Sequence, residues 1–326
     1  MLEDKSFMAA TFDLQSILQL PVGAAGPFYY KRKLVLFNLT IYQGSQEGYC
    51  FVWMETEGGR GANEIGSILF RYLSQLPSHI KEVSFFFDSC SGQNRNQHVT
   101  AMMLHAVRTL PVEIIEQKFL VSGHTQMECD SMHSAIEHSS RNKNLYVPND
   151  WHNVMLSARR RKPYTVIEMK HDDFYDLKDL SQQTLLNRRQ NTEGETVNWL
   201  DIRVIRVEKS KPNTVFYKTD FDEDFMKLEQ GQATFSLLKP AYMSPMPIAK
   251  AKKCDLISLC QSGGIPSYYH DFYHNLPSGE DNAETDENIP SVASQAQDKL
   301  KRGKVSPYNL SNLKFSCLKY VAYLFV

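Results

Sequence analysis

The chain has 326 residues, 42% of them hydrophobic, which is enough for one large domain or two of ordinary size around a substantial core. Its formal net charge of −1 excludes binding to a polyanion through bulk charge, so any nucleic-acid surface has to be a local patch. No apolar stretch reaches the roughly 18 residues of a membrane-spanning helix, and we expect no membrane partner.

The first 140 residues alternate between strand and helix patterns. Short β-rich apolar runs predict strands, and apolar residues spaced at i, i+3 and i+4 predict amphipathic helices. A Pro/Gly loop is predicted at residues 20–27 and a hairpin turn at Gly44–Gly48. The predicted strands are Phe7–Leu14, Lys33–Tyr42, Tyr49–Glu55, Val83–Phe87 and Ile114–Val121, and the predicted helices are Ile65–Leu76, Val99–Leu110 and Glu128–His138.

The order of these elements is β-β-β-α-β-α-β-α. Turns and loops join the first three strands, which predicts an antiparallel meander, whereas helices separate the later strands, which predicts that these are parallel. In this order the first and fourth strands can lie side by side at the centre of the sheet. We therefore expect an α/β fold, a mixed sheet covered by helices.

The pattern weakens after Pro148. The second half of the chain predicts a helix at Asp150–Arg161, a strand at Tyr164–Met169, β-rich segments at Val197–Val207 and Val215–Tyr217, and disorder at 278–304, which is polar and acidic. We expect a first domain at 8–175, a smaller β-rich extension at 176–276, and a disordered or aberrant tail at 277–326.

Asp88 is the most informative residue of the chain. It follows the apolar run Val83–Phe87 and is followed by the small polar segment Ser89–Asn96. Open α/β sheets keep their chemistry at the carboxyl ends of such strands. The plainer interpretation is that Asp88 caps the loop, but a cap does not require the Gly-Gln-Asn-Arg-Asn sequence that comes next.

Further acids fall where they can reach Asp88. Asp13 lies on the first predicted strand, beside the fourth, and the helix after the fifth strand carries Asp130 and Glu137. These two helical acids share a face but are separated by about 10 Å along the axis, so only one can join the pair. We favour Asp130, although it can also be a first-turn acid stabilised by the helix dipole.

Clustered carboxylates repel one another unless a cation neutralises them, and their oxygens suit Mg²⁺ or Mn²⁺. Two such ions stabilise both reacting oxygens of a phosphoryl displacement. The candidate catalytic and metal-binding residues are therefore Asp13, Asp88 and Asp130. His124 is a further catalytic candidate that would orient a phosphate or a metal-bound water, the alternative being a turn histidine bonded to backbone.

Polar and basic residues supply candidate contacts to nucleic acid. Asn94 and Arg95 follow Asp88, and a basic run follows the helix predicted near residue 150. Such a run is also typical of a solvated helix end or a nuclear import signal. The run consists of Arg159, Arg160, Arg161 and Lys162.

The six cysteines are scattered and form no CxxC pair, which favours reduced thiols. Cys90, Cys129 and His124 would make a three-ligand zinc site, but buried thiols are the better interpretation. The N-terminal residues include an acidic pair and lack the apolar core of a secretory signal. We expect a nuclear or cytoplasmic location and no secretion.

The order of elements, with acids at these places, resembles the ribonuclease H-like fold of DNA transposases and integrases. The segments Phe87–Asn96 and Phe119–Thr125, together with Asp130 and Thr11–Gln15, resemble a large uncharacterised family of insects and other invertebrates that looks transposon-derived. The resemblance covers roughly residues 8–275. Members of that family generally extend upstream of the first acid, so we expect this chain to lack whatever recognises transposon ends.

The resemblance implies a transposase-derived DNA nuclease or strand transferase with a DDD motif that depends on Mg²⁺ or Mn²⁺, acts on DNA and forms a homo-oligomer. Two alternatives stay open. One is a catalytically inactive descendant that binds DNA or protein, and the other is a fragment that folds poorly.

Overall fold

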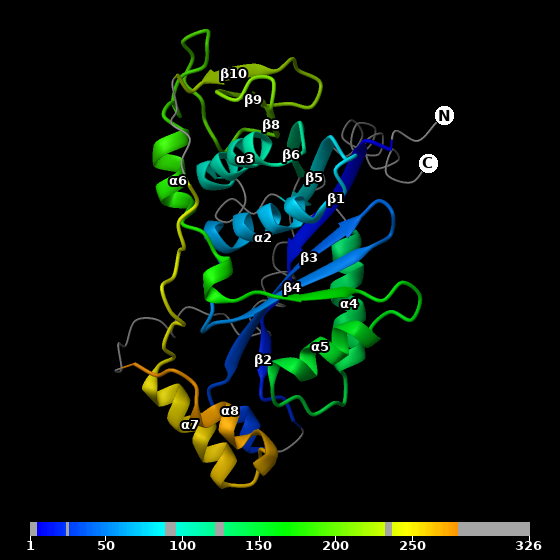
Figure 1. Cartoon of the computed structure of the whole chain (residues 1–326). Coiled ribbons are helices and arrows are strands. Elements are labelled where there is room, and N and C mark those ends of the chain that lie inside the picture. Colours follow the sequence, from blue (N-terminus) through cyan, green and yellow to red (C-terminus); the bar gives the residue numbers. More distant parts are fainter. Residues whose placement is uncertain (1–4, 24–25, 89–95, 121–126, 232–236, 280–326) are drawn as a thin grey trace, which may run out of the picture.

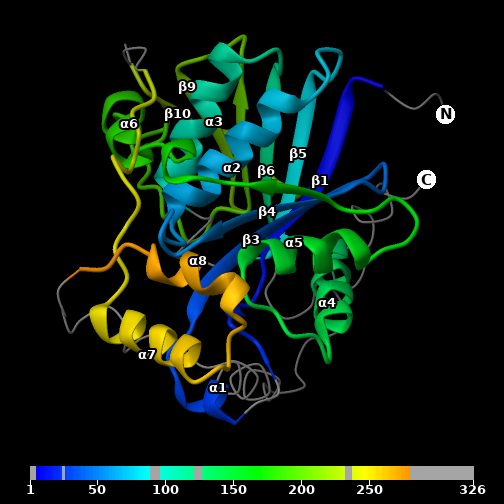
Figure 2. The same cartoon turned by 60° about the horizontal axis from the view of Figure 1, so that its bottom comes forward.

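The computed structural model describes residues 5–23, 26–88, 96–120, 127–231 and 237–279. Within them, strands form one ten-stranded sheet, and helices cover both of its faces (Figures 1 and 2). The α/β prediction, with a mixed sheet flanked by helices, is confirmed. None of the helices in these residues combines the length and the apolar character that crossing a bilayer requires.

The strands and helices have the following bounds. The strands are β1 (Phe7–Leu14), β2 (Leu18–Leu20), β3 (Leu34–Gln43), β4 (Gly48–Met54), β5 (Glu82–Asp88), β6 (Ile114–Leu120), β7 (Thr165–Glu168), β8 (Val204–Glu208), β9 (Thr214–Lys218) and β10 (Met226–Glu229). The helices are α1 (Pro27–Tyr30), α2 (Ala62–Gln75), α3 (Gln97–Thr109), α4 (Glu128–Ser140), α5 (Pro148–Ser157), α6 (Leu177–Thr184), α7 (Lys250–Gln261) and α8 (His270–His274), with 3-10 turns at His171–Asp173 and Ser267–Tyr269.

The sheet order is β10-β9-β8-β6-β5-β1-β3-β4-β7, and β2 pairs with β3 beside this path. β1 is antiparallel to β3 and β3 is antiparallel to β4, which confirms the predicted meander. β5 is parallel both to β1 and to β6. The first and fourth predicted strands therefore lie side by side, and β1 occupies the middle of the sheet.

The remaining elements extend this frame. The predicted loop at residues 20–27 includes the end of β2 and the start of α1, and α5 ends at Ser157 rather than at Arg161. β8 pairs antiparallel with β6, so the strands of the predicted extension join the same sheet. The division into a first domain and an extension stays a prediction. Residues 280–326, which include most of the predicted tail, lie outside the described residues.

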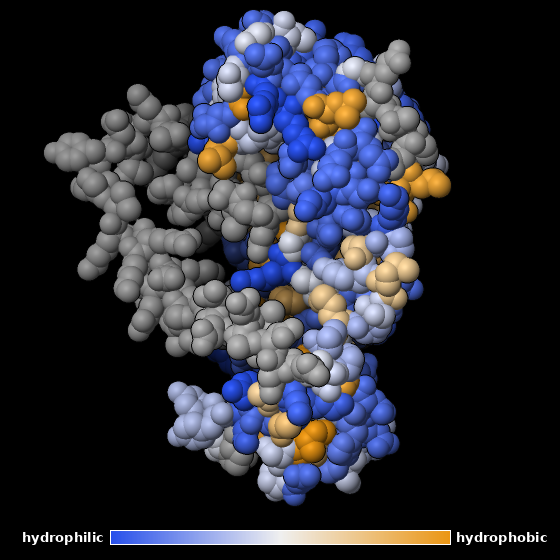
Figure 3. All heavy atoms as spheres, turned by 90° about the vertical axis from the view of Figure 1, so that its left-hand side faces the viewer, coloured by the Kyte–Doolittle hydropathy of each residue, from blue (hydrophilic) through white to orange (hydrophobic). Residues whose placement is uncertain are grey.

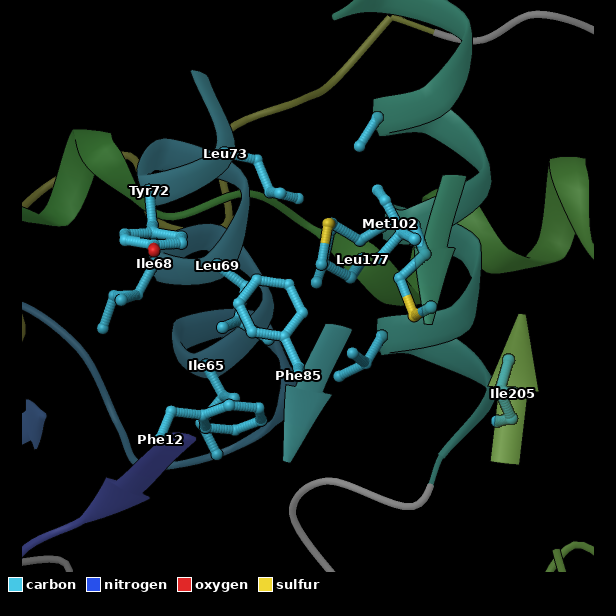
Figure 4. Packing of buried hydrophobic residues seen from close by; sticks show 14 of the residues in the cluster. Phe12, Ile65, Ile68, Leu69, Tyr72, Leu73, Phe85, Met102, Leu177 and Ile205 are labelled. Carbon is cyan, nitrogen blue, oxygen red and sulfur yellow. The ribbon is translucent and has the colours of Figure 1, made fainter. Parts of the chain in front are cut away.

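The face of the sheet beneath α2, α3 and α6, here called the α2/α3 face, is apolar throughout its centre. Phe12 of β1 and Phe85 of β5 meet the buried stripe of α2, with Met102 of α3 and Leu177 of α6 close by (Figure 4). α2 and α6 approach closely, because a Cβ atom on Gly66 would lie 2.2 Å from a methyl group of Leu177. This stripe consists of Ile65, Ile68, Leu69, Tyr72 and Leu73, at the predicted helical spacing.

The opposite face, here called the α4 face, carries α4 near β1 and β3, α5 beside α4 and β7, and α7 and α8 over the far end of β3 and β4 (Figure 2). Its apolar cluster includes Met132 and Ile136 of α4 and Trp151 of α5. A polar layer separates α4 from β1 and β3, as described below. Figure 3 shows apolar side chains scattered over a mainly hydrophilic surface. Leu237 and Met243 are among the exposed apolar side chains of the described residues.

Candidate metal centre

Asp13 lies near the carboxyl end of the central strand. Phe12 stacks on Phe87 with 4.7 Å between ring centroids, which turns it to the α2/α3 face. Because successive side chains of a strand point to opposite faces, Thr11 and Asp13 point to the α4 face. Thr11 accordingly contacts the side chains of Glu128 and Cys129 of α4, with Oγ1 3.4 Å from an atom of each.

The register of β1 and β5 places Asp88 beside Asp13. The two strands pair in parallel from Phe7↔Glu82 to Thr11↔Phe86. Continued by two residues beyond its last pair, the same register would bring the backbone of Asp13 level with that of Asp88. The structure describes Asp88 by its backbone alone.

Asp130 reaches the same place from the first turn of α4. Its Oδ2 accepts a hydrogen bond of 3.0 Å from the backbone N–H of Met127, which closes a capping box. Asp130 is therefore the first-turn acid that the sequence allowed, at the third position of the helix, and this does not exclude a second role. One carboxylate oxygen of Asp130 lies within 4.8 Å of both an Asp13 oxygen and a ring nitrogen of His133.

His133 lies one turn after Asp130 on the same face of α4. Its Nδ1 is 3.9 Å from Oδ2 of Asp13, and its side chain is 12% exposed, against 34% for Asp13. Its Nε2 is 2.8 Å from Oγ1 of Thr40 on β3. Thr40 is directly opposite Asp13 in the β1–β3 register and donates a 3.2 Å hydrogen bond to the Asp13 carbonyl.

Sequence reasoning identified the two acids and missed the histidine. The signal was present, because Asp130-x-x-His133 has the i, i+3 spacing that brings two side chains to one helix face. Glu137, the alternative third acid, is exposed further along α4, and no described metal-ligand cluster includes it.

A layer of buried polar side chains lies between α4 and the strands β1 and β3, next to this cluster. The Asn38 side chain donates to Gln15 (2.8 Å), and the Gln15 amide donates to the His133 carbonyl (3.5 Å). Cys129 is fully buried, its thiol donates to the Thr40 carbonyl, and burial raises the pKa of that thiol to about 12. A neutral buried thiol does not suit zinc, which binds thiolates.

The other proposed zinc ligands, Cys90 and His124, lie outside the described residues, as do Asn94 and Arg95. The four cysteines that the structure describes are free thiols: Cys50, Cys129, Cys254 and Cys260.

The basic run after α5 contacts the β3–β4 hairpin turn. Arg159 donates to the carbonyls of Lys162 (2.7 Å) and Gln46 (3.0 Å), and Lys162 donates to the carbonyl of Ser45. This turn is bonded to Ala9, four residues before Asp13, or about 13 Å along the strand. Arg160 and Arg161 are exposed. The phosphate contact predicted for the run stays a prediction.

The fold and this site define an α/β protein whose mixed sheet carries an Asp/His cluster at the end of its central strand. Residues 37–211 match a family described as a domain of unknown function (DUF7869), and the chain belongs to that family. The matched region includes Asp88, Asp130 and His133 and begins after Asp13. No curated protein and no solved structure matches the chain.

Proposed function

We propose that this chain is the ribonuclease H-like core of a transposon-derived enzyme, a divalent-metal-dependent nuclease or strand transferase that acts on DNA. One observation carries the proposal: Asp13 and Asp130, from the central strand and from the helix after β6, converge with His133 to within 4.8 Å. The parallel register of β1 and β5, which would bring Asp13 level with Asp88 if continued by two residues, supports a three-carboxylate site.

The sheet supports the finer assignment of the fold. The part of the sheet with the order β4-β3-β1-β5-β6 contains an antiparallel meander, formed by β1, β3 and β4. The two strands that follow in the chain, β5 and β6, are parallel to β1, and β5 lies next to β1. α4 then brings its first turn to the end of β1, where its acid meets Asp13. This is the arrangement that the sequence resemblance implies.

The residues present fit a divalent cation, because two carboxylates and an imidazole converge from β1 and α4. A cation bound there would neutralise the acids and stabilise the charge that develops on a phosphodiester. In the proposal, Asp13, Asp88 and Asp130 hold the cation, and His124 orients the phosphate or the attacking water. Asn94, Arg95 and the Arg159–Lys162 run hold the DNA backbone.

A cleavage assay on supercoiled and linear DNA with Mg²⁺ or Mn²⁺ tests this function. We expect metal-dependent nicking or joining by the wild-type chain and at least a 100-fold loss of rate in Asp13→Asn and Asp88→Asn, the order reported when one group that stabilises transition-state charge is removed. Glu137→Gln is the matched control, because it removes an exposed acid from the same helix outside the cluster. Equal activity in the wild-type chain and all three variants would show that Asp13 and Asp88 are not needed for cleavage.

A second candidate is a catalytically inactive descendant that binds DNA or protein. One observation favours it: both described acids already serve the local backbone, since Asp13 accepts from Leu14 N–H and Asp130 from Met127 N–H. This alternative predicts DNA affinity that falls steeply with salt and no cleavage with either metal. A nuclear or cytoplasmic homo-oligomer is part of both proposals, and size measurement with and without DNA tests the assembly.

A further inference from the structure

We propose that His133 is a direct metal ligand through Nδ1, and that this nitrogen makes the site prefer Mn²⁺ to Mg²⁺. The inference rests on the metal site of the proposed function and adds a ligand that the three-carboxylate site lacks. Three observations carry it: the place of the ring, its hydrogen-bonded nitrogen and its restricted surroundings.

The first observation is the place of the ring. Nδ1 of His133 lies 3.9 Å from Oδ2 of Asp13, too long for a hydrogen bond between them. Two ligands of one cation, each about 2.1 Å from it, are typically separated by roughly 3–4 Å. The distance to Asp13 therefore suits a shared ion, and a carboxylate oxygen of Asp130 lies within 4.8 Å of a ring nitrogen of His133 and of an Asp13 oxygen.

The second observation is the hydrogen-bond partner of the other ring nitrogen, Nε2. Thr40 has one hydroxyl proton, and its 3.2 Å bond to the Asp13 carbonyl uses that proton. With that proton on the Asp13 carbonyl, the 2.8 Å contact between Thr40 Oγ1 and His133 Nε2 has the ring as donor, which is the tautomer that we assign. In neutral imidazole a proton on Nε2 leaves the lone pair on Nδ1, which is the nitrogen that lies near the acids.

The third observation is that the ring is held before any metal binds. A metal-ligating histidine usually donates its other N–H to a neighbouring oxygen, which orients the ring and raises its basicity. Thr40, 0% exposed on β3, supplies that oxygen. The His133 backbone is also tied to the polar layer, because its carbonyl accepts from the buried Gln15 amide. The imidazole ring is thus already oriented in the metal-free fold, so metal binding costs little further side-chain entropy.

The chemistry of the donor set gives the metal preference. Carboxylates and water suit Mg²⁺ and Mn²⁺ alike, whereas imidazole suits transition metals and is a poor partner for Mg²⁺, which prefers oxygen. Replacing His133 by a side chain without the ring nitrogen should therefore weaken Mn²⁺ binding more than Mg²⁺ binding. The competing interpretation is that His133 is protonated and forms an ion pair with Asp13 without any metal.

Electron paramagnetic resonance of bound Mn²⁺ distinguishes these interpretations. In the 326-residue chain we expect electron spin-echo modulation from one ¹⁴N nucleus, shifted when histidine is labelled with ¹⁵N. His133→Gln should abolish this signal and weaken Mn²⁺ binding at least 10-fold, on the scale of lost metal-site contacts, with a smaller change for Mg²⁺. His138→Gln, on the same helix but exposed, is the control and should change neither.

Thr40→Val tests Thr40 as a positioning residue, because valine keeps the shape and removes the acceptor for Nε2–H. We expect it to weaken Mn²⁺ binding while the ¹⁴N signal persists, a combination that a purely structural role of Thr40 does not give. The labelled wild-type protein also tests the ligand without any variant that has to fold.

The outcomes separate this inference from the proposed function. Carboxylate-dependent Mn²⁺ binding with no ¹⁴N signal, or with a signal that His133→Gln leaves unchanged, would overturn the histidine ligand and keep the metal site. No Mn²⁺ binding by the folded wild-type chain would overturn both. A His133-dependent signal without DNA cleavage would support the ligand and reject the nuclease.

Discussion

On one side of β1, Phe12 is completely buried, stacks on Phe87 and meets Phe85 edge to face. On the other side, Thr11 and Asp13 meet polar groups of α4. The same contrast extends across the sheet. The α2/α3 face is a continuous apolar cluster. The α4 face places hydroxyl, amide, thiol and imidazole groups between its helix and strands.

The difference shows how one strand serves two purposes. Apolar contacts are non-directional and stabilise the fold in proportion to the area that they bury. Buried polar groups need particular partners at particular distances, so they add orientation at a cost in desolvation. The α2/α3 face is therefore expected to dominate stability, and the α4 face is expected to position the candidate metal ligands. Four experiments test this division.

The largest expected effect is on the α2/α3 face. Phe12→Ala removes a ring that contacts Phe85 and Phe87, and should lower the free energy of unfolding by about 3–5 kcal/mol. Phe7→Ala is the control on the same strand, because its side chain is already 41% exposed. It should cost less than about 1 kcal/mol. Urea unfolding measures both, and equal costs would contradict the dominance of the α2/α3 face.

Metal binding should stabilise the α4 face. Mn²⁺ at 100 times its dissociation constant should raise the free energy of unfolding by about 2.7 kcal/mol, because it binds the folded chain alone. Asp13→Asn should abolish this gain. Without metal, this variant should be no less stable than wild type, because it removes a like charge from the cluster. Denaturant titrations with Mn²⁺ or with chelator measure both, and an equal gain in the variant would reject Asp13 as a ligand.

Alkaline pH should weaken the α4 face through its buried thiols. Burial raises the pKa of both Cys50 and Cys129 from an ordinary 9 to about 12. Because the folded pKa is the higher one, the unfolded chain loses these protons first. The contribution of the two protonated thiols to the free energy of unfolding is complete below pH 9 and is lost as the pH rises towards 12. At pH 10 the loss should be about 1 kcal/mol for each thiol.

Cys129→Ala separates this pH effect from the packing of the thiol. The variant should be less stable at pH 7, but its stability should fall less between pH 9 and pH 10 than that of wild type, because one titrating group is gone. Urea unfolding at a series of pH values measures the slope. Identical slopes would mean that Cys129 ionises as readily in the fold as in the unfolded chain.

Much of the frame follows from local patterns in the sequence. The stripe of α2 has helical spacing, and the apolar runs that became β1, β3, β5 and β6 are long enough to be recognised. Connectivity then orders the strands, because turns favour antiparallel neighbours and helices favour parallel ones. β2 and α1 were missed because three or four residues show no periodicity, and β2 forms only by pairing with β3.

The candidate site was less accessible to sequence reasoning. Topology alone was enough to expect Asp13 and Asp130 at one place, and the structure brings them together. The role of Thr40 could not be foreseen, because its contact with His133 depends on how α4 lies against β3. The partners of Arg159 are backbone carbonyls of a distant turn, which no charge pattern identifies.

The smallest expected effect separates the two roles of Asp130. Asparagine can still accept from Met127 N–H, so Asp130→Asn should keep the cap of α4 and lower the free energy of unfolding by less than about 0.5 kcal/mol. Asp130→Ala removes the cap as well and should cost about 1 kcal/mol. Both variants should lose Mn²⁺ affinity to a similar extent, because both lack the charged oxygen. If Asp130→Asn binds Mn²⁺ as tightly as wild type, Asp130 is only a cap, and the centre has to be built from Asp13, Asp88 and His133.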